Sequence, residues 1–558
     1  MIGVIADPAE QEVVREFFEL FKTPWEFYRK ERQYDVLLCA GDSQFDASAK
    51  LTVVYSGRKT QLDDEQKILV NHQCSGACTF TYQGHSFPLY GETIKFSGKG
   101  ACLLTVAGSR ECGIFLNETE DRVLARIGYD LFGEVRTLLT VGQPAANAAI
   151  PALELHIALL RDLITATGIS LVEIPAVPDG FQFIACLTHD VDHPAIRAHK
   201  WDHTMFGFLY RATLGSLFKV FRGKMPIQSL LANWGAVVKL PFVYMGYGKD
   251  FWGEFDDHYL ELESDLPSTF FVIPFKNYAG RTANGPAPAI RASRYGARDI
   301  AKTIEKLMTC GREVGLHGID AWLDSAKACR ELEEIRRLTG VSEIGVRMHW
   351  LYHNQQSPTT LETAGAAYDS TIGYNETVGY RAGTTQVYKP LGTAQLLELP
   401  MHVMDTALFY PSYLELSPQQ AKTILMQMVD NAAHHGGVLT INWHDRSLAP
   451  ERLWDVSYRE LLGEMKKRGA WFSTAGQAVA WFQKRRSVVF EKDSVEPNCI
   501  RAKLTVSPSE KIPALRLRTH KAAAQSGTGA LAWSSSSNVD MAVVEGLETN
   551  VLLGPHHE

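Results

Sequence analysis

The stretch Phe183–Pro194 reads FIACLTHDVDHP and places a polar cluster directly at the end of an apolar run. The apolar residues predict a buried strand, in which side chains two positions apart point to the same side. Asp190 and Asp192 therefore face one way and Val191 the other. Two carboxylates so close repel each other unless a proton or cation separates them. One interpretation is a metal site with Asp192 on the ion and Asp190 as general base for water; the other is a solvated loop.

Strands that end in a polar tip recur after residue 178 and predict the fold. We expect strands at FQFIACLTHD, STFFVIP, REVGLHG, IGVRMHW, LLELPMH, GVLTINWH and GAWFST. Helical stretches such as GARDIAKTIEKLMTCG lie between several of them, which favours parallel pairing in a barrel-like α/β domain. In such barrels the active site lies at the C-terminal ends of the strands.

The length of 558 residues predicts about two to four domains. We expect an N-terminal α/β domain at 1–145, a helical connector at 146–177, a barrel at 178–486 with a basic insert at 196–250, and a small β-rich C-terminal segment at 487–558.

The composition is that of an ordinary globular protein, with 45% hydrophobic and 21% charged residues. A net charge of -7 argues against nucleic acid as the main partner. The nine cysteines form no regular framework, which indicates free thiols and a reducing compartment. Because there is no signal-like N-terminus and no run of apolar residues long enough to span a membrane, the expected location is cytoplasmic.

Three further strand tips carry candidate functional residues. His317 ends EVGLHG, Arg347 and His349 end GVRMHW, and His444 follows LTINW. A single histidine at such a place is more often structural than a ligand, so each motif is weak alone. Four polar tips in succession on one parallel barrel indicate a shared site.

The order THDVD, EVGLHG, a strand-ending Arg and LTINWH resembles the polysaccharide deacetylases, the NodB-homology or carbohydrate esterase 4-like family, in a branch with an Asp-x-Asp first motif. The resemblance covers roughly residues 178–485. It implies a distorted (β/α)7 barrel and hydrolysis of N-acetyl groups on sugars. It also implies a divalent metal, zinc in the first place, with Co2+ or Ni2+ as alternatives.

Carried onto this chain, the resemblance implies five roles. Asp190 is the base, Asp192 and His317 are metal ligands, Arg347 orients the base, and His444 is the general acid.

One ligand of the family is missing, because its second motif has a further histidine where this chain has Ala321. Catalytic zinc sites normally have three protein ligands. The candidates for the third are His349, Asp320 and His193, and His349 is preferred because it lies at a strand tip two residues after Arg347. The stretch HGIDAW is also similar to a motif of the lipid A pathway deformylases, which act on lipid-linked aminosugars.

Four further residues are candidates for binding substrate. Asp369 and Tyr374 lie in the polar stretch 368–384, which either grips sugar hydroxyls or is a structured loop. Asp405 is a candidate support for the active site from the next strand, and Trp350 is a candidate sugar platform.

The insert at 196–250 is basic and aromatic, and between Arg197 and Lys249 only Asp202 is acidic. One interpretation is a helical cap that touches phospholipid or a lipid-linked substrate at the inner membrane face. The other is a helical lid or an oligomer contact.

The sequence therefore predicts a metal-dependent hydrolase that removes N-acetyl or similar acyl groups from an aminosugar of a polysaccharide or lipid-linked glycan, in surface polysaccharide biosynthesis. The main alternative is a catalytically silent barrel that binds glycan as a scaffold or regulator, which Ala321 favours. A third hypothesis, cleavage of glycosidic bonds, needs a carboxylate pair at glycosidase separation. The sequence makes no prediction of the oligomeric state.

Overall fold

The computed structural model describes residues 1–41, 49–97, 103–106, 111–119, 121–223, 225–492, 499–505, 512–520, 539–544 and 548–552. The chain divides into two units. The N-terminal unit comprises Met1–Gly180, Arg381–Gln386 and Ala480–Glu558, and the central unit comprises Phe181–Tyr380 and Val387–Val479. The finer division into four segments stays a prediction, and part of the segment 487–558 lies outside the described residues.

The N-terminal unit is built on a six-stranded sheet in the order β10-β11-β4-β3-β1-β2. Its strands are β1 (Ile2–Ile5), β2 (Trp25–Phe27), β3 (Val36–Ala40), β4 (Leu51–Tyr55), β10 (Ile114–Glu118) and β11 (Val123–Ile127). All neighbours pair in parallel except β10 and β11. The expected domain at 1–145 stays a prediction, because the unit that contains these residues extends to Gly180 and includes two later segments.

The other elements of this unit are helices and small antiparallel sheets. The helices are α1 (Gln11–Phe21), α2 (Gln61–Glu65), α3 (Leu131–Thr140) and α4 (Ala152–Ala166). The small sheets are β5 (Val70–Cys74) with β8 (Thr93–Phe96); β6 (Cys78–Tyr82) with β7 (His85–Leu89) and β9 (Leu104–Thr105); β12 (Leu171–Glu173) with β24 (Leu515–His520) and β25 (Val539–Val544); and β22 (Val488–Lys492) with β23 (Cys499–Leu504) and β26 (Glu548–Leu552).

A fully buried ion pair joins α2 to the main sheet. Arg126 Nε donates to Asp63 Oδ1 at 2.9 Å, and both side chains are completely buried. The other oxygen of Asp63 accepts the backbone NH of Thr60 at 2.8 Å and so caps α2. A buried pair of this kind strongly destabilises a protein when one partner alone is removed.

The central unit is built on a seven-stranded parallel sheet in the order β18-β17-β14-β13-β20-β19, with β21 pairing β13 as well. The strands are β13 (Phe183–Val191), β14 (Thr269–Val272), β17 (Glu313–Gly318), β18 (Val346–Met348), β19 (Val403–Met404), β20 (Val438–Asn442) and β21 (Ala470–Ser473). Single parallel bridges continue the pairing from Val346 to Asp369 and from Asp369 to Glu398. The prediction of an α/β domain with parallel strands is confirmed, and the distorted (β/α)7 barrel stays a prediction.

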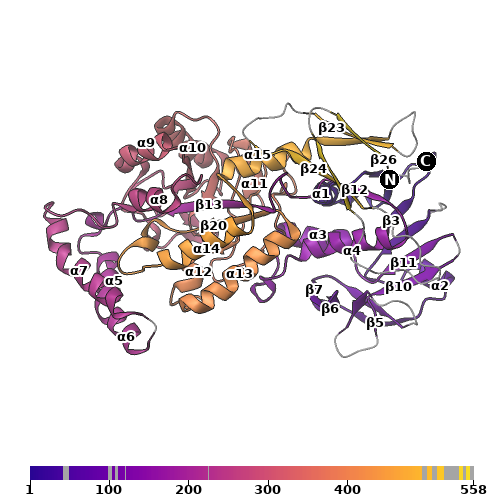
Figure 1. Cartoon of the computed structure of the whole chain (residues 1–558), viewed down its shortest axis with the longest axis horizontal. Helices are drawn as coiled ribbons and strands as arrows, with labels where there is room; N and C mark the ends of the chain where they lie inside the picture. The colour runs from indigo at the N-terminus through magenta and orange to yellow at the C-terminus, as the bar shows by residue number, and fades with distance from the viewer. Residues whose placement is uncertain are drawn as a thin grey trace. The chain divides into compact units, whose positions relative to one another are not determined.

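Helices connect most of these strands and lie on both sides of β13 and β20 in the view of Figure 1. They are α8 (Phe255–Glu263), α9 (Ala301–Thr309), α10 (Ser325–Thr339), α11 (Ser357–Thr363), α12 (Asp405–Phe409), α13 (Pro418–His435) and α14 (Asp455–Lys467). The last helix, α15 (Ala475–Arg486), begins in the central unit, and its residues from Ala480 onwards belong to the N-terminal unit. A short hairpin, β15 (Arg281–Thr282) and β16 (Gly285–Pro286), follows β14.

Helices fill much of the segment between β13 and β14. It contains α5 (His203–Tyr210), the π-helical turn η4 (Arg211–Gly215), α6 (Ser216–Phe221) and α7 (Ile227–Tyr244). Within the central unit, α5, α6 and α7 extend beyond the sheet and its covering helices (Figure 1).

The core of the central unit explains why β13 is apolar. Every residue of β13 is buried, because neighbouring strands cover its edges and other parts of the unit cover both of its faces. Phe183, Leu187 and Val191 pack in one cluster with residues of β14, β17, β18 and β20 and of the helices α9, α10, α13 and α14.

Two further expectations concern the membrane and the thiols. No helix among the described residues is long and apolar enough to cross a membrane. Cys112 is disulfide-bonded, whereas Cys39, Cys74, Cys78 and Cys186 are among the free thiols. The expectation that the cysteines are free is therefore wrong at Cys112, since spacing in the sequence does not define pairing.

Candidate metal and catalytic site

The parallel register brings the polar strand tips to one edge of the central sheet. Asp190 lies at the end of β13, His317 pairs with Arg347 across β17 and β18, and His444 follows β20. Because parallel strands all end at the same edge, residues more than 250 positions apart in the sequence meet there.

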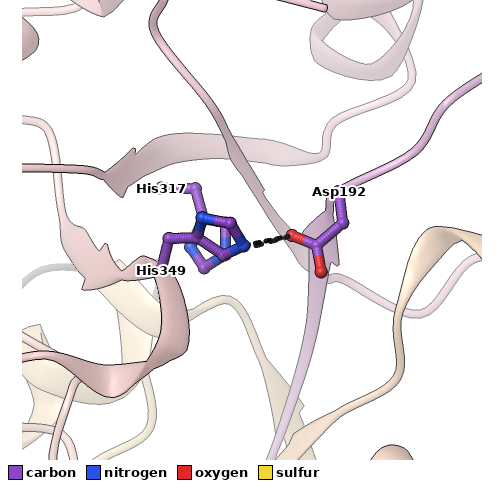
Figure 2. Close-up of side chains that lie close together, drawn as sticks. All are labelled: Asp192, His317 and His349. Carbon is purple, nitrogen blue, oxygen red and sulfur yellow. Dashed lines mark ion pairs between the residues drawn. The ribbon is translucent and has the colours of Figure 1, made fainter. Parts of the chain in front are cut away.

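Asp192, His317 and His349 form a compact cluster (Figure 2). One ligand atom from each residue lies within 4.8 Å of the others. The Asp192 Oδ1 atom is 3.3 Å from His317 Nε2 and 3.7 Å from His349 Nε2. Ligands about 2.0–2.2 Å from a tetrahedral zinc lie about 3.3–3.6 Å apart, so these separations suit such an ion.

The chemistry of the three side chains also fits a divalent cation. The buried Oδ1 of Asp192 has no hydrogen-bond partner among the described residues. His317 Nδ1 lies 3.0 Å from the Arg347 carbonyl oxygen, which can only accept, so Nδ1 carries the proton and the lone pair of Nε2 faces Asp192. Burial lowers the pKa of His349 to about 3, which keeps its imidazole neutral as a ligand must be.

The three candidates for the missing ligand occupy different surroundings. His349 joins the cluster, directly before two residues in the left-handed region, Trp350 (φ 64°) and Leu351 (φ 54°). Asp320 instead accepts hydrogen bonds from Tyr278, Arg281 and Lys327. His193 Nδ1 lies 3.2 Å from His199 Nε2. Strained backbone of this kind gathers at functional sites, and here it directly follows His349.

Asp190 is held beside the cluster as an ionised carboxylate. Its Oδ1 accepts from Arg347 Nη1 at 3.1 Å, and its Oδ2 accepts from Asn442 Nδ2 at 2.8 Å. Burial alone would raise the pKa of Asp190, but His317, Arg347 and His444 outweigh it and lower that pKa. The sequence does not predict the role of Asn442, and the only signal is its position two residues before His444.

Arg347 is fixed on every side and so positions Asp190. Its guanidinium donates to Thr188 Oγ1 at 2.6 Å, to the Ser370 carbonyl at 3.1 Å and to Ser370 Oγ at 2.9 Å. The Phe271 ring packs against it at 4.5 Å from Cζ. A buried cation with these partners presents one fixed edge to the carboxylate.

His444 lies on the other side of Asp192 and is paired with Asp405. His444 Nδ1 is 2.6 Å from Asp405 Oδ1, and Asp405 Oδ2 accepts the His444 backbone NH at 2.7 Å and the Ser447 hydroxyl. Burial opposes the charged imidazole, but Asp405, Asp192 and Asp190 outweigh it and raise the pKa of His444 to about 9. His444 Nε2 lies 3.8 Å from Asp192 Oδ2. A cation on Asp192 would offset that residue's share of the shift, while Asp405 keeps its own.

A cavity of about 310 Å³ opens onto this site and includes Asp192, His349 and Trp350 in its lining. Trp350 is 36% exposed, and its role as a sugar platform stays a prediction. Asp369 and Tyr374 are buried and are not part of the lining. Asp369 instead bridges two chain segments of the sheet, and burial raises its pKa to about 6. Direct contact of these two residues with substrate stays a prediction.

Comparison with known proteins finds solved structures that are similar to this chain at low sequence identity. No family model matches the chain, and no curated protein matches it. A solved protein of Mycobacterium smegmatis assigned as a polysaccharide deacetylase is 20% identical over 56% of this chain and 95% of its own, with a TM-score of 0.35. Its counterpart from Pseudomonas aeruginosa PAO1 is 13% identical over 56% and 94%, with a TM-score of 0.33. A carbohydrate esterase 4 family pseudoenzyme from Bacillus anthracis is 11% identical over 39% and 57%, with a TM-score of 0.23.

Polysaccharide deacetylases are thus among the solved structures that this chain resembles, as the sequence predicted. The identities and TM-scores are too low to assign an activity. What the chain can do chemically has to come from its own site.

Proposed function

We propose that this protein is a metal-dependent hydrolase that removes an N-acetyl or similar acyl group from an aminosugar. The observation that carries the proposal is the Asp192, His317 and His349 cluster with Asp190 on one side and His444 on the other. A base, an acid and a set of metal ligands next to one another are what amide hydrolysis needs. Zinc fits the one-carboxylate, two-imidazole donor set, and Co2+ or Ni2+ are the alternatives.

Each residue has a definite task in this reaction. A bound zinc ion supplies Lewis-acid activation of the attacking water and of the amide carbonyl. Asp190 accepts a proton from the attacking water, and Arg347 and Asn442 hold both of its oxygens in place. His444 delivers a proton from Nε2 to the departing amine, because Asp405 fixes its Nδ1.

The finer parts of the proposal come from the sequence. The substrate is a carbohydrate, and we extend the proposal to a lipid-linked glycan in surface polysaccharide biosynthesis, processed in the cytoplasm at the inner membrane face. No nucleic acid is proposed as a partner.

The test is the Asp190→Asn variant, assayed for acetate release from free, nucleotide-linked and lipid-linked N-acetylaminosugars. We expect activity to fall by at least about 100-fold while zinc stays near one ion per chain, because a general base is worth that much and Asp190 is not a ligand. Asp430→Asn, at an exposed carboxylate of α13, is the matched control and should remain active. An active Asp190→Asn enzyme would refute the assignment of the base.

A catalytically silent barrel is the second candidate, because Ala321 replaces the family's ligand. It predicts that the chain purified after zinc-supplemented expression contains no metal. Stoichiometric zinc that is lost in His317→Ala, together with acetate release, would exclude it.

A further inference from the structure

The cavity beside the metal cluster is rich in arginine. Arg211 from η4, Arg291 and Arg446 contribute to its lining, and Asp192 is the single acidic residue in the lining among the described residues. Arg291 already donates to the carbonyl oxygens of three residues, so it mainly supports the walls. No such supporting role explains the presence of Arg446 and Arg211 in the cavity lining.

Arg446 is a buried cation with two unpaired donors. It is 7% exposed, and its Nε and Nη1 atoms have no hydrogen-bond partner within the described part of the chain. Its guanidinium lies over the Trp252 ring, 4.7 Å from the centroid. Glu451 and Asp445 act on it electrostatically, but neither accepts a hydrogen bond from the guanidinium and neither lines the cavity.

Arg211 adds a second cation from the insert. Its Nε is buried and likewise lacks a partner among the described residues. Burial, and after it Arg452, lower the pKa of both Arg211 and Arg446, so each charged guanidinium is destabilised where it stands. Leaving buried charged donors unpaired is costly, and an anion placed between them would stabilise both.

We propose that Arg446 and Arg211 form a subsite for an anionic group, phosphate in the first place, carried by the acylated aminosugar whose acyl group lies at the metal cluster. This rests on the proposed function for the identity of the sugar, but the anion site itself does not depend on turnover. Phosphate offers several acceptor oxygens, which suits two arginine forks.

The test is calorimetric titration of the full-length, zinc-loaded chain with inorganic phosphate and with N-acetylglucosamine 1-phosphate. Arg446→Met and Arg211→Met should each weaken binding by about tenfold or more. Arg459→Met, at an exposed arginine of α14, is the matched control and should bind as the unaltered chain does. Thermal midpoints without ligand show whether the Arg446 variant is folded, and the less buried Arg211 provides an independent variant if it is not.

Phosphate also binds zinc, so the titration is repeated with His349→Ala, which lacks one of the proposed metal ligands. Binding that survives in His349→Ala and is lost on adding Arg446→Met supports the subsite. Binding that needs zinc and is unchanged in both arginine variants overturns it. If no substrate releases acetate, the titrations still decide the subsite, so the two proposals fail separately.

The source of the phosphate is distinguished by a pair of substrates. Preferential turnover of soluble N-acetylglucosamine 1-phosphate assigns it to a sugar phosphate, and preferential turnover of the same sugar on an isoprenoid phosphate in vesicles assigns it to a lipid. Equal turnover of N-acetylglucosamine without phosphate would overturn the subsite.

A separate observation concerns the outer face of the insert. Phe206, Tyr210, Leu214, Phe218 and Phe221 recur every three or four residues along α5, η4 and α6, and each is exposed. On α7 the exposed series is Ile227, Leu231, Trp234, Val238 and Phe242. The spacing places each series on one face of its helix, while a second set of apolar residues, including Phe208, Ala236 and Leu240, is buried in a separate small cluster.

An exposed apolar surface of this extent indicates that a binding partner covers it. Phe221 is 80% exposed and Val238 is 69% exposed. Between Asp202 and Asp250 the chain has no acidic residue and six basic ones: Arg211, Lys219, Arg222, Lys224, Lys239 and Lys249. Pairing with a second copy through this face would bring like charges together, because such interfaces are symmetric. An anionic bilayer matches both the apolar residues and the charge.

We infer that the outer face of α5–α7 docks on a phospholipid bilayer with anionic headgroups. The full-length chain should co-sediment with phosphatidylglycerol vesicles, weakly with phosphatidylcholine vesicles, and less at high salt. The double variant Phe221→Asp and Val238→Asp should reduce the bound fraction by about tenfold or more. Val456→Asp, at an exposed apolar residue of α14, is the matched control.

Absence of binding to phosphatidylglycerol vesicles at low salt overturns this inference. So does self-association, seen by analytical ultracentrifugation, that the double variant abolishes without vesicles present.

Discussion

At the scale of single residues, Asp405 holds His444 at two points. One carboxylate oxygen contacts Nδ1 and the other accepts the backbone NH of the same residue. The imidazole therefore keeps one orientation, with Nε2 towards Asp192. The sequence predicts that Asp405 supports the active site from the next strand, and these two contacts with His444 are the means by which it would do so.

Asp405→Asn should lower kcat by about 10- to 100-fold, the usual effect of losing a residue that orients a functional histidine. The pKa of His444, about 9 with Asp405 in place, should fall. Because the proposed role of His444 is that of the protonated acid, activity should then be lost at a lower pH on the alkaline side. Measuring kcat from pH 6 to 10 tests both points. They would be contradicted if the alkaline limb of the plot of kcat against pH lay at the same pH as in the unaltered enzyme.

His349→Ala should weaken zinc binding by more than about 100-fold, because losing a ligand costs more than losing an outer partner of one. Metal content after dialysis against a zinc buffer measures this. His193→Ala, which removes one of the alternative candidates, should keep its zinc. The reverse pattern would move the third ligand from His349 to His193.

From the sequence alone, the site residues that can be predicted are those at the ends of predicted strands. An apolar run ending in Asp or His identifies β13, β17, β18 and β20, and parallel pairing then predicts that their tips meet. The sequence does not identify Arg446 and Arg211, because they are 235 positions apart and their meeting depends on how the insert folds. The polar neighbours of Asp369 indicate a loop, and only its pairing with Val346 and Glu398 reveals a buried position.

At the scale of secondary-structure elements, the chain after β17 approaches its neighbours closely at Gly345. A Cβ there would lie 1.9 Å from Tyr368 Cζ. Tyr368 cannot retreat freely, since it is buried and its hydroxyl donates to Glu313 at 2.8 Å. The absence of a side chain at Gly345 thus sets the distance between β18 and the segment that follows α11.

Gly345→Ala should lower the free energy of unfolding by about 1–3 kcal/mol, the usual cost of overpacking. Gly463→Ala is the matched control, because Gly463 lies within α14 and a Cβ added there would meet no atom within 4 Å. That variant should gain about 0.5–1 kcal/mol from helix propensity. Urea unfolding of both variants gives the comparison, and equal midpoints would contradict it.

At the scale of the whole molecule, the two units have different sources of stability. The N-terminal unit contains the buried Arg126–Asp63 pair, and the central unit contains the proposed metal site. A change that destabilises one unit should therefore leave the unfolding temperature of the other unit unchanged.

Asp63→Ala should destabilise the N-terminal unit by about 3–5 kcal/mol, because it leaves the Arg126 guanidinium buried without its counter-charge. Differential scanning calorimetry should show one transition moving to lower temperature. Asp64→Ala, at the exposed neighbouring carboxylate, should change little. If Asp63→Ala and Asp64→Ala lowered the transition temperature equally, the role of the buried Arg126–Asp63 pair would be contradicted.

Zinc at about 1,000 times its dissociation constant should stabilise the central unit by about 4 kcal/mol. EDTA should reverse the shift, and His349→Ala should show none. A zinc-dependent shift that persists in His349→Ala would place the stabilising ion elsewhere.

The outward apolar face of α5–α7 has a consequence for kinetics. An enzyme resting on a bilayer searches for a lipid-linked substrate in two dimensions, so its rate follows the number of substrate molecules per unit of surface rather than per unit of volume. Diluting the substrate with inert anionic lipid, at constant total concentration, should then slow turnover in proportion, whereas diluting the vesicles with buffer should not while the enzyme remains bound.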